Sequence, residues 1–373
     1  MSIQLNKLKP SASMEVTRLS KELKEAGQEV FGFSIGDTHF DPPAAIAGRM
    51  SQLPVAASHY GPAQGLAQLR EAISKFHGSF TSDEVAVVPG LKQGFYYALQ
   101  SLEKSTVAVL EPAWLGYQAT CVLAGYDYLS VNTYKPEWLE HLESMDFDVL
   151  MACIPNNPDG SILTERQVDR ILQVLRSKDA WLVLDTIYDH YAYDTDIKHL
   201  LSRLESYPKL IVGNGFSKSH AMTGYRIGYL LVRDEQVMAN IIKIQQNLAT
   251  CPSSFAQHLL AENTFTNEID AFKDYYAINR EVVLDIFPKW KPFRPDGGFY
   301  YFVDLSQYGI EDGEAFCKHA LRNSGAALVP GTAYGQGFEK YVRLSFSLER
   351  QTLRKGLLKL KELIDKEYAQ TNS

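Results

Sequence analysis

The sequence contains little cysteine and no long apolar run, and both absences limit the kind of protein it encodes. Its four cysteines, Cys121, Cys153, Cys251 and Cys317, lack paired spacing. This spacing argues against a disulfide framework or a zinc site and favours buried thiols in a reducing compartment. No apolar stretch is long enough to cross a bilayer, and the first ten residues lack the apolar core of a signal peptide. We therefore expect a cytoplasmic protein without a metal site.

Positive charge is not in excess either. Lysine and arginine number 37 against 44 acidic residues, which gives a formal net charge of −7. Non-specific binding to nucleic acid is therefore not expected, and an acidic substrate would need a local cluster of cations. Repeats and low-complexity tracts are also missing. What remains is ordinary globular composition in 373 residues, 45% of them hydrophobic, a length that suggests two domains or one large and one small.

Apolar runs and helical patterns alternate between residues 85 and 232, which predicts a mostly parallel sheet covered by helices on both faces. A helix ending near Gly27 and a strand-like alternation at residues 31–35 precede this region, and helices are expected over 234–265 and 268–287. We expect an α/β fold with three segments. Residues 1–45 form an arm and part of a small domain, residues 46–287 a large domain, and residues 288–373 the rest of a small α+β domain.

One lysine, Lys218, follows the apolar run Leu210 to Val212, and Arg226 opens the next apolar run eight residues later. A lysine between buried strands is costly, and burial lowers the pKa of its amine and makes it nucleophilic. Schiff-base chemistry requires such an amine. Taken alone, the pattern also fits a surface loop with two ordinary cations.

Other polar residues follow the ends of neighbouring predicted strands. A strand ending at Val88 leads through Gly90 into a helix near Lys92, and the N-terminus of a helix there can bind an anion. Asp185 ends another buried run, where a carboxylate needs a cationic or hydrogen-bonding partner. Asn157 stands in an Asn-Pro and Asp-Gly turn. Lys92 also has a plain interpretation as a solvated lysine, and Asn157 as part of a mere turn.

The order of these segments along the chain resembles the class I/II aminotransferases of pyridoxal-phosphate fold type I. It is most similar to the branch that includes bacterial aspartate and prephenate aminotransferases. The resemblance runs from about Leu8 to the C-terminal helix. The matching segments are LKPSAS, Gly36 with FDPP, Tyr60 with Gly65 and Leu69-Arg70, GLKQ, EPAWLGY, PNNPDG, Asp185 to Tyr188, SK with GYRIGY, VPG and VRLS.

This resemblance implies pyridoxal 5′-phosphate as the cofactor and gives each residue a role. Lys218 would form the Schiff base and move the substrate proton. Asp185 would face the pyridine nitrogen and keep it protonated. Asn157 and Tyr188 would hydrogen-bond the 3-oxygen, and Trp114 would stack on the ring. The catalytic set is thus Lys218, Asp185 and Tyr188.

The resemblance also implies a phosphate site and a substrate site. The residues expected at the phosphate are Gly90, Leu91, Lys92, Ser217, Arg226 and, reaching across from the neighbouring subunit of a homodimer, Tyr60. Arg343 would bind the α-carboxylate of an amino acid or 2-oxo acid as a fork, with Gly36 and Asn157 beside it. Lys92 and Ser13 match residues that help bind a distal carboxylate, which favours a dicarboxylic donor. No membrane or nucleic-acid partner is implied.

Departures from the family pattern concern the mouth of the site more than the cofactor. Asp159 replaces a usual threonine, Asp37 and Thr38 replace Glu-Pro, and Leu91 replaces a small residue. Two added acids would suit a cationic substrate if their side chains face the mouth. Gly215 stands where many relatives have a phosphate-binding serine. Two alternatives therefore remain beside an aminotransferase, namely a lyase or cyclase that uses the same cofactor site and, more remotely, an inactive regulatory homologue.

Overall fold

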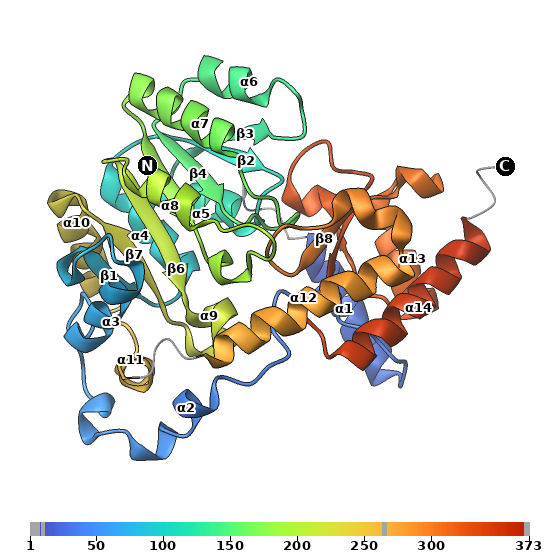
Figure 1. The fold of residues 1–373 in the computed structure, drawn as a ribbon, viewed down its shortest axis with the longest axis horizontal. Coiled ribbons are helices and arrows are strands. Elements are labelled where there is room, and N and C mark those ends of the chain that lie inside the picture. The colour runs from blue at the N-terminus through green and yellow to red at the C-terminus, as the bar shows by residue number, and fades with distance from the viewer. Residues whose placement is uncertain (1–7, 9–11, 263–266, 369–373) are drawn as a thin grey trace.

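A seven-stranded sheet forms the centre of the larger part of the molecule (Figure 1). The computed structural model describes residues 8, 12–262 and 267–368, and only the backbone of residues 12–14. The strands are β1 (Val85–Val88), β2 (Thr106–Glu111), β3 (Asp127–Asn132), β4 (Val149–Cys153), β5 (Trp181–Asp185), β6 (Leu210–Gly215) and β7 (Gly228–Val232). Their spatial order is β1-β7-β6-β5-β4-β2-β3. Only β7 runs antiparallel to its neighbours, β1 and β6, so the predicted mostly parallel sheet is confirmed.

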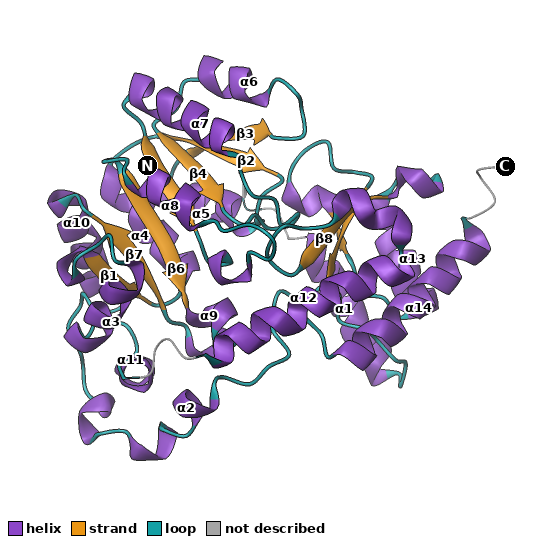
Figure 2. Cartoon of the chain, viewed as in Figure 1, coloured by secondary structure: helices purple, strands orange, loops and turns teal. Residues whose placement is uncertain are grey.

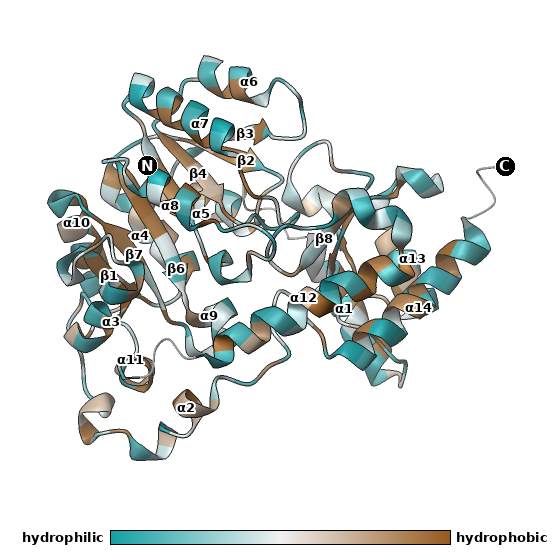
Figure 3. Ribbon diagram, viewed as in Figure 1, coloured by the Kyte–Doolittle hydropathy of each residue, from teal (hydrophilic) through white to brown (hydrophobic). Residues whose placement is uncertain are grey.

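Helices cover both faces of this sheet, as Figure 2 shows. They are α3 (Ala67–His77), α4 (Leu91–Leu102), α5 (Gly116–Ala124), α6 (Trp138–Ser144), α7 (Glu165–Lys178), α8 (Lys198–Glu205), α10 (Glu235–Leu248) and α11 (Ser254–Leu260). Alternate strand residues enter different cores: Val149 and Met151 pack in the core that contains α4 and α10, and Leu150 in the core that contains α3 and α7. Strands buried on both faces are therefore mostly apolar, and Figure 3 shows them largely as brown ribbons between two-toned helices.

A three-stranded antiparallel sheet forms the second, smaller part. Its order is β8-β10-β9, with β8 (Tyr300–Asp304), β9 (Val329–Pro330) and β10 (Tyr341–Ser345). Packed around it are α1 (Ala12–Glu25), α13 (Gly313–Ser324) and α14 (Arg350–Glu367). The helix α12 (Glu268–Ile286) runs from the large sheet to this part, where it contacts α14 (Figure 1). The predicted α/β class, with its smaller α+β part, is confirmed.

Two sequence expectations for local structure are wrong. Residues 31–35 do not form a strand: the amide of Phe33 donates to the carbonyl of Phe31 at 2.9 Å, and the chain turns, leaving one bridge between Phe31 and Ala326. The helix expected over 234–265 ends at Leu248 and resumes as α11, because Thr250 has φ of 63° and Pro252 has no amide hydrogen. No described helix is both long and apolar enough to span a membrane.

Candidate active site

A cavity of about 490 Å³ lies at the carboxyl ends of the parallel strands, between them and the small sheet. The register places Cys153, Asp185 and Gly213 side by side at this edge. The residues that follow these strand ends therefore meet. Eleven residues predicted from the sequence line the cavity: Gly36, Leu91, Lys92, Trp114, Asn157, Asp185, Tyr188, Ser217, Lys218, Arg226 and Arg343.

Lys218 lies in the short helix α9 (Phe216–Ser219), directly after β6. Its Nζ donates a hydrogen bond to the carbonyl oxygen of Gly36. Burial lowers the pKa of Lys218 to about 8, while the nearby charge of Asp37 acts in the opposite direction. A substantial fraction of this amine is therefore neutral near physiological pH, and a neutral amine is nucleophilic.

Asp185 is the last residue of β5 and is 5% exposed. Its Oδ2 accepts a hydrogen bond from the hydroxyl of Tyr117 at 2.6 Å, and its Oδ1 accepts one from the amide of Ile187 at 3.0 Å. Burial raises the pKa of Asp185 to about 6, although both hydrogen bonds and the charge of Lys218 oppose this. Ionising this carboxylate is costly without a closer positive charge, so it is suited to a cationic group of a ligand.

Tyr117 was not predicted as a partner of Asp185. Its only sequence signal is its place three residues after Trp114, in a segment that follows a strand end. The indole of Trp114 and the ring of Tyr117 meet edge to face, with centroids 5.4 Å apart. A Cβ on Gly116 would lie 2.4 Å from the indole, so the absence of a side chain there lets Trp114 sit close to the helix start. Trp114 thereby presents an aromatic surface to the cavity.

The start of α4 and the guanidinium of Arg226 meet at one end of the cavity. Gly90, the residue before α4, has φ of 80°, and a Cβ on it would lie 2.5 Å from Nη2 of Arg226. Arg226 Nη1 donates to the carbonyl oxygen of Thr223 at 2.8 Å. The first turn of a helix leaves amide groups without intrahelical partners, and the helix dipole is positive there. This corner therefore favours an anion such as phosphate.

Arg343 on β10 also lines the cavity and is 5% exposed. Its Nη1 donates to Oδ1 of Asn157 at 3.2 Å and its Nη2 to the carbonyl of Ser34 at 2.9 Å. The guanidinium carbon lies 4.1 Å from the centre of the Tyr300 ring. Nε of Arg343 is buried without a hydrogen-bond partner among the described residues. A buried guanidinium with an unused donor fits a carboxylate ligand.

Asp159 and Asp37 are the two acidic departures from the family pattern, and their side chains point in different directions. The carboxylate of Asp159 folds back onto its own turn, where it accepts from Asn156 Nδ2 at 2.9 Å, from the amide and hydroxyl of Ser161, and from Tyr134 at 3.2 Å. It does not line the cavity. Asp37 does, and its Oδ2 accepts from the hydroxyl of Thr223 at 2.9 Å. Only one of the two expected charges therefore faces the site.

Two predicted site residues, Gly90 and Tyr60, do not line the cavity. Gly90 lies behind Arg226, as described above. Tyr60 is 87% exposed at the surface. The side chain of Ser13 lies outside what the structure describes. A single chain therefore brings together the residues expected for a cofactor ring and a substrate carboxylate, but it does not bring Tyr60 to them.

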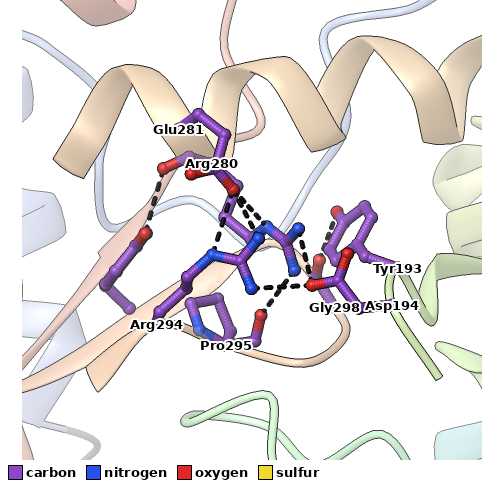
Figure 4. A network of polar contacts seen from close by, with 8 residues as sticks. Tyr193, Asp194, Arg280, Glu281, Arg294, Pro295 and Gly298 are labelled. Carbon is purple, nitrogen blue, oxygen red and sulfur yellow. Dashed lines mark hydrogen bonds and ion pairs between the residues drawn. The ribbon is translucent and has the colours of Figure 1, made fainter. Parts of the chain in front are cut away.

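A charged network behind the cavity holds the chain segment that leads into β8 (Figure 4). Arg280 of α12 is 3% exposed; its Nη2 lies 3.0 Å from Oδ2 of Asp194 and its Nη1 donates to the carbonyl of Pro295 at 3.0 Å. Arg294 contacts the same Asp194 oxygen at 2.6 Å and Glu281 at 2.7 Å. Arg280 is the buried member of this set, and removing Asp194, which is half exposed, would take a charged partner from it. The network thus fixes the backbone from which Tyr300 enters the cavity.

The sequence model of the family described as aminotransferase class I and II matches residues 28–360. The chain belongs to this family. The aspartate aminotransferase of Bacillus subtilis is 28% identical, over 97% of this chain and 98% of the relative. The aromatic-amino-acid aminotransferase 2 of Thermococcus litoralis is 26% identical, over 98% of each chain. A solved single mutant of Thermus thermophilus aspartate aminotransferase has a TM-score of 0.87 and 27% identity, covering 97% of this chain and 99% of that one.

These findings confirm the family resemblance and the class of activity. The chain is an aminotransferase, an enzyme that moves an amino group between an L-amino acid and a 2-oxo acid. Nothing among the relatives favours the lyase alternative. The family uses pyridoxal phosphate, and the relatives' names span acidic and aromatic amino acids. The family alone therefore does not fix the substrate.

Proposed function

We propose that this aminotransferase binds pyridoxal 5′-phosphate in the cavity, covalently attached to Nζ of Lys218. The observation that carries the proposal is the presence of a buried amine with a lowered pKa and a buried carboxylate with a raised pKa in one cavity. The arrangement fits the cofactor because each buried group gains a partner from it. When bound, the cofactor supplies an electron sink for the electrons left at the substrate α-carbon.

The ring of the cofactor fits between three groups of the large sheet. Asp185 would pair with a protonated ring nitrogen, and Tyr117 and Ile187 hold its carboxylate in place. Asn157 and Tyr188, whose Nδ2 and hydroxyl are 3.5 Å apart, would donate to the 3-oxygen. Trp114 would cover one face. The phosphate would bind at the start of α4, where Gly90 meets Arg226, and we expect Leu91, Lys92 and Ser217 of the cavity lining to contribute.

The substrate would bind through its α-carboxylate. Arg343 lines the cavity and offers a planar fork for that carboxylate, and its buried Nε has no hydrogen-bond partner among the described residues. Gly36, whose carbonyl accepts from Lys218, and Asn157 lie beside it. The amine of Lys218, once released, would remove the proton from the α-carbon and deliver it to the cofactor side, because its lowered pKa leaves part of it neutral.

A dicarboxylic donor is the substrate class that we propose. Lys92 is exposed in the cavity lining, with Nζ 5.7 Å from the centre of the Trp114 ring, where it can meet a second carboxylate. Ser13 would assist it. A cationic donor is the second candidate, because the carboxylate of Asp37 faces the same cavity. Asp159 gives that candidate no support, since its carboxylate is engaged in its own turn.

A panel of donor amino acids tests both the activity and the substrate class. Wild type should convert aspartate or glutamate to the 2-oxo acid, and Lys92→Ala should lower kcat/KM for these donors by about tenfold or more. The kcat/KM for alanine and phenylalanine should fall much less, because these donors have no second carboxylate. Lys92→Arg, which keeps the charge, is the matched control. Equal loss for every donor, or a wild-type preference for basic amino acids, would rule out the dicarboxylic class, and no 2-oxo acid from any donor would contradict the activity.

We further propose a homodimer with shared active sites. The segment around the short helix α2 (Ala44–Ala47) and the turns after it exposes the apolar side chains of Met50, Val55 and Tyr60. Apolar groups gathered on a surface commonly mark an interface, and the mouth of a neighbour's cavity would give Tyr60 the phosphate contact expected of it. The cytoplasmic location and the domain division at residues 46 and 288 also remain proposals.

Mixed dimers test this sharing. Combining a Tyr60→Phe subunit with a Lys218→Ala subunit should give one site with both defects and one with neither. A random equimolar mixture should therefore reach about a quarter of wild-type activity, well above the average of the two homodimers, if Tyr60→Phe alone is strongly impaired. Activity equal to that average, or a fully active monomer in sedimentation measurements, would refute shared sites.

A further inference from the structure

Four buried side chains of the cavity form a closed cycle of contacts. Arg343 Nη1 donates to Asn157 Oδ1 at 3.2 Å, and Asn157 Nδ2 lies 3.5 Å from the hydroxyl of Tyr188. The hydroxyls of Tyr188 and Tyr300 are 3.0 Å apart, and the Tyr300 ring lies 4.1 Å from the guanidinium carbon of Arg343. Tyr300 therefore closes the cycle with two different chemical groups, its hydroxyl and its aromatic face.

The cycle joins the two sheets at the site. Tyr300 and Arg343 stand on the neighbouring antiparallel strands β8 and β10, where Tyr300 pairs with Ser345 and Arg343 with Phe302. Asn157 and Tyr188 follow the strands β4 and β5 of the large sheet. Gly36 leaves room for the contact, since a Cβ there would lie 2.9 Å from the Tyr300 hydroxyl. The position of Tyr300 thus links the two groups proposed to bind the 3-oxygen with the arginine proposed to bind the substrate.

The capacity of each group to donate or accept hydrogen bonds decides the direction of the bonds in the cycle. A guanidinium can only donate, so Asn157 must present its oxygen to Arg343 and its amide nitrogen to Tyr188. Tyr188 has one proton, and an acceptor in the cavity can use it only if Tyr300 is the donor of the pair. The Tyr188 oxygen then accepts from Asn157 and Tyr300, and its own proton is left for the ligand. Among the described residues, the Tyr300 hydroxyl has Tyr188 as its one hydrogen-bond partner.

We propose that Tyr300 is a positioning residue that directs the Tyr188 proton to the cofactor 3-oxygen through its hydroxyl and orients Arg343 through its ring. This inference rests on the proposed binding of pyridoxal phosphate. It assigns separate effects to the two parts of the side chain. The hydroxyl acts on the electronic state of the cofactor, and the ring acts on the binding of the substrate carboxylate.

The variant Tyr300→Phe isolates the hydroxyl because it keeps the ring. Without the donor, Tyr188 donates less effectively to an anionic 3-oxygen, so the bound chromophore should hold its proton more tightly. The apparent pKa of its visible absorbance transition should rise, corresponding to a three- to tenfold change in proton affinity, the range of one hydrogen bond. Among the groups that act on the pKa of Tyr188, Arg343 is charged, and Tyr300 and Cys153 are the other titratable neighbours of Tyr188. KM for the donor should stay within about twofold of wild type, since the ring remains over Arg343.

Three further variants make the test specific. Tyr300→Leu should show the same pKa change and also raise KM about three- to thirtyfold, because the contact between ring and guanidinium is lost. In a Tyr188→Phe background, Tyr300→Phe should no longer change the pKa, since the hydroxyl through which it acts is gone. Tyr301→Phe is the matched control: it removes a buried hydroxyl on the same strand that donates to the carbonyl of Arg280 at 2.9 Å. It should leave the absorbance titration unchanged.

The outcomes distinguish this inference from the proposed function. If Tyr300→Phe binds the cofactor and titrates as wild type does, or if its effect persists unchanged in the Tyr188→Phe background, the positioning role is wrong while cofactor binding stands. If wild type incubated with pyridoxal phosphate shows no visible band and no attachment to a lysine, the proposed function itself fails. A Tyr301→Phe titration that moves as much as that of Tyr300→Phe would also overturn the role, because the effect would then be one of stability alone.

Discussion

Lys218→Ala should lower kcat by about 10⁴-fold or more while leaving the fold intact, because it removes both the covalent attachment and the group that moves the substrate proton. The buried Nζ has a pKa lowered to about 8, and its hydrogen-bond partner among the described residues is the backbone carbonyl of Gly36, which also lines the cavity. Without Lys218, Asp185 still accepts hydrogen bonds from Tyr117 and from the amide of Ile187, and Asp37 still accepts one from Thr223. The phosphate corner and Asp185 remain, so the variant should still retain pyridoxal phosphate, measured by gel filtration and absorbance.

Lys209→Ala is the matched control for this variant. Lys209 precedes β6 at the strand end remote from Lys218, and it pairs with Asp179 at the surface. Its replacement should leave turnover near that of wild type, since exposed ion pairs contribute little. A Lys218→Ala enzyme that retained more than about a tenth of wild-type kcat would show that another group moves the proton.

Asp185→Asn should fold and bind the cofactor but lower kcat on the order of 10²–10³-fold, because an amide cannot keep the ring nitrogen protonated. Asp189→Asn is the matched control: Asp189 lies four residues on and is partly buried, burial raises its pKa to about 7, and it accepts a hydrogen bond from Asn214 at 2.7 Å outside the cavity. That variant should keep a near-normal absorbance spectrum and rate. Near-normal turnover in Asp185→Asn would refute the role of the carboxylate.

The carboxylate of Asp185 makes a pH-dependent contribution to the stability of the apoprotein. Burial raises its pKa from 3.8 to about 6, so the folded state binds this proton more tightly than the unfolded state does. Stability should therefore fall as pH rises from about 4 to about 6, by on the order of 3 kcal/mol from this group. Chemical denaturation of the apoprotein should show a fall that is smaller in Asp185→Asn than in wild type by this amount, because Asp189, whose pKa is also raised, contributes to the fall in both proteins. Added pyridoxal phosphate should offset it by pairing the charge.

The predictable part of the site is the part that follows strand ends. Lys218, Asp185 and Asn157 each come shortly after an apolar run, and parallel strands bring their carboxyl ends to one edge. The chain pattern alone therefore places these residues together. Family resemblance adds Arg343, which comes from a separate sheet and could not be placed by periodicity.

The contacts that the sequence did not predict join residues that are far apart along the chain, and no local sequence pattern indicates such pairs. Tyr117 and Asp185 are 68 residues apart, and Tyr188 and Tyr300 are 112 apart. Tyr117 and Tyr300 resemble ordinary core residues in the sequence. The turn at Phe31 and Phe33 was mistaken for a strand because alternation of apolar residues also suits a turn with two buried rings. Asp159 faces its own turn because short acidic side chains readily accept local amide hydrogens.

Borohydride reduction of the holoprotein, followed by peptide mapping, tests the central claim most directly. The purified protein incubated with pyridoxal phosphate should be yellow, and reduction should fix the cofactor on the peptide that contains Lys218, which follows β6 in the cavity. The Lys218→Ala protein treated in parallel should carry no label on that peptide. A label on another lysine, such as Lys92, or no label at all, would contradict the account.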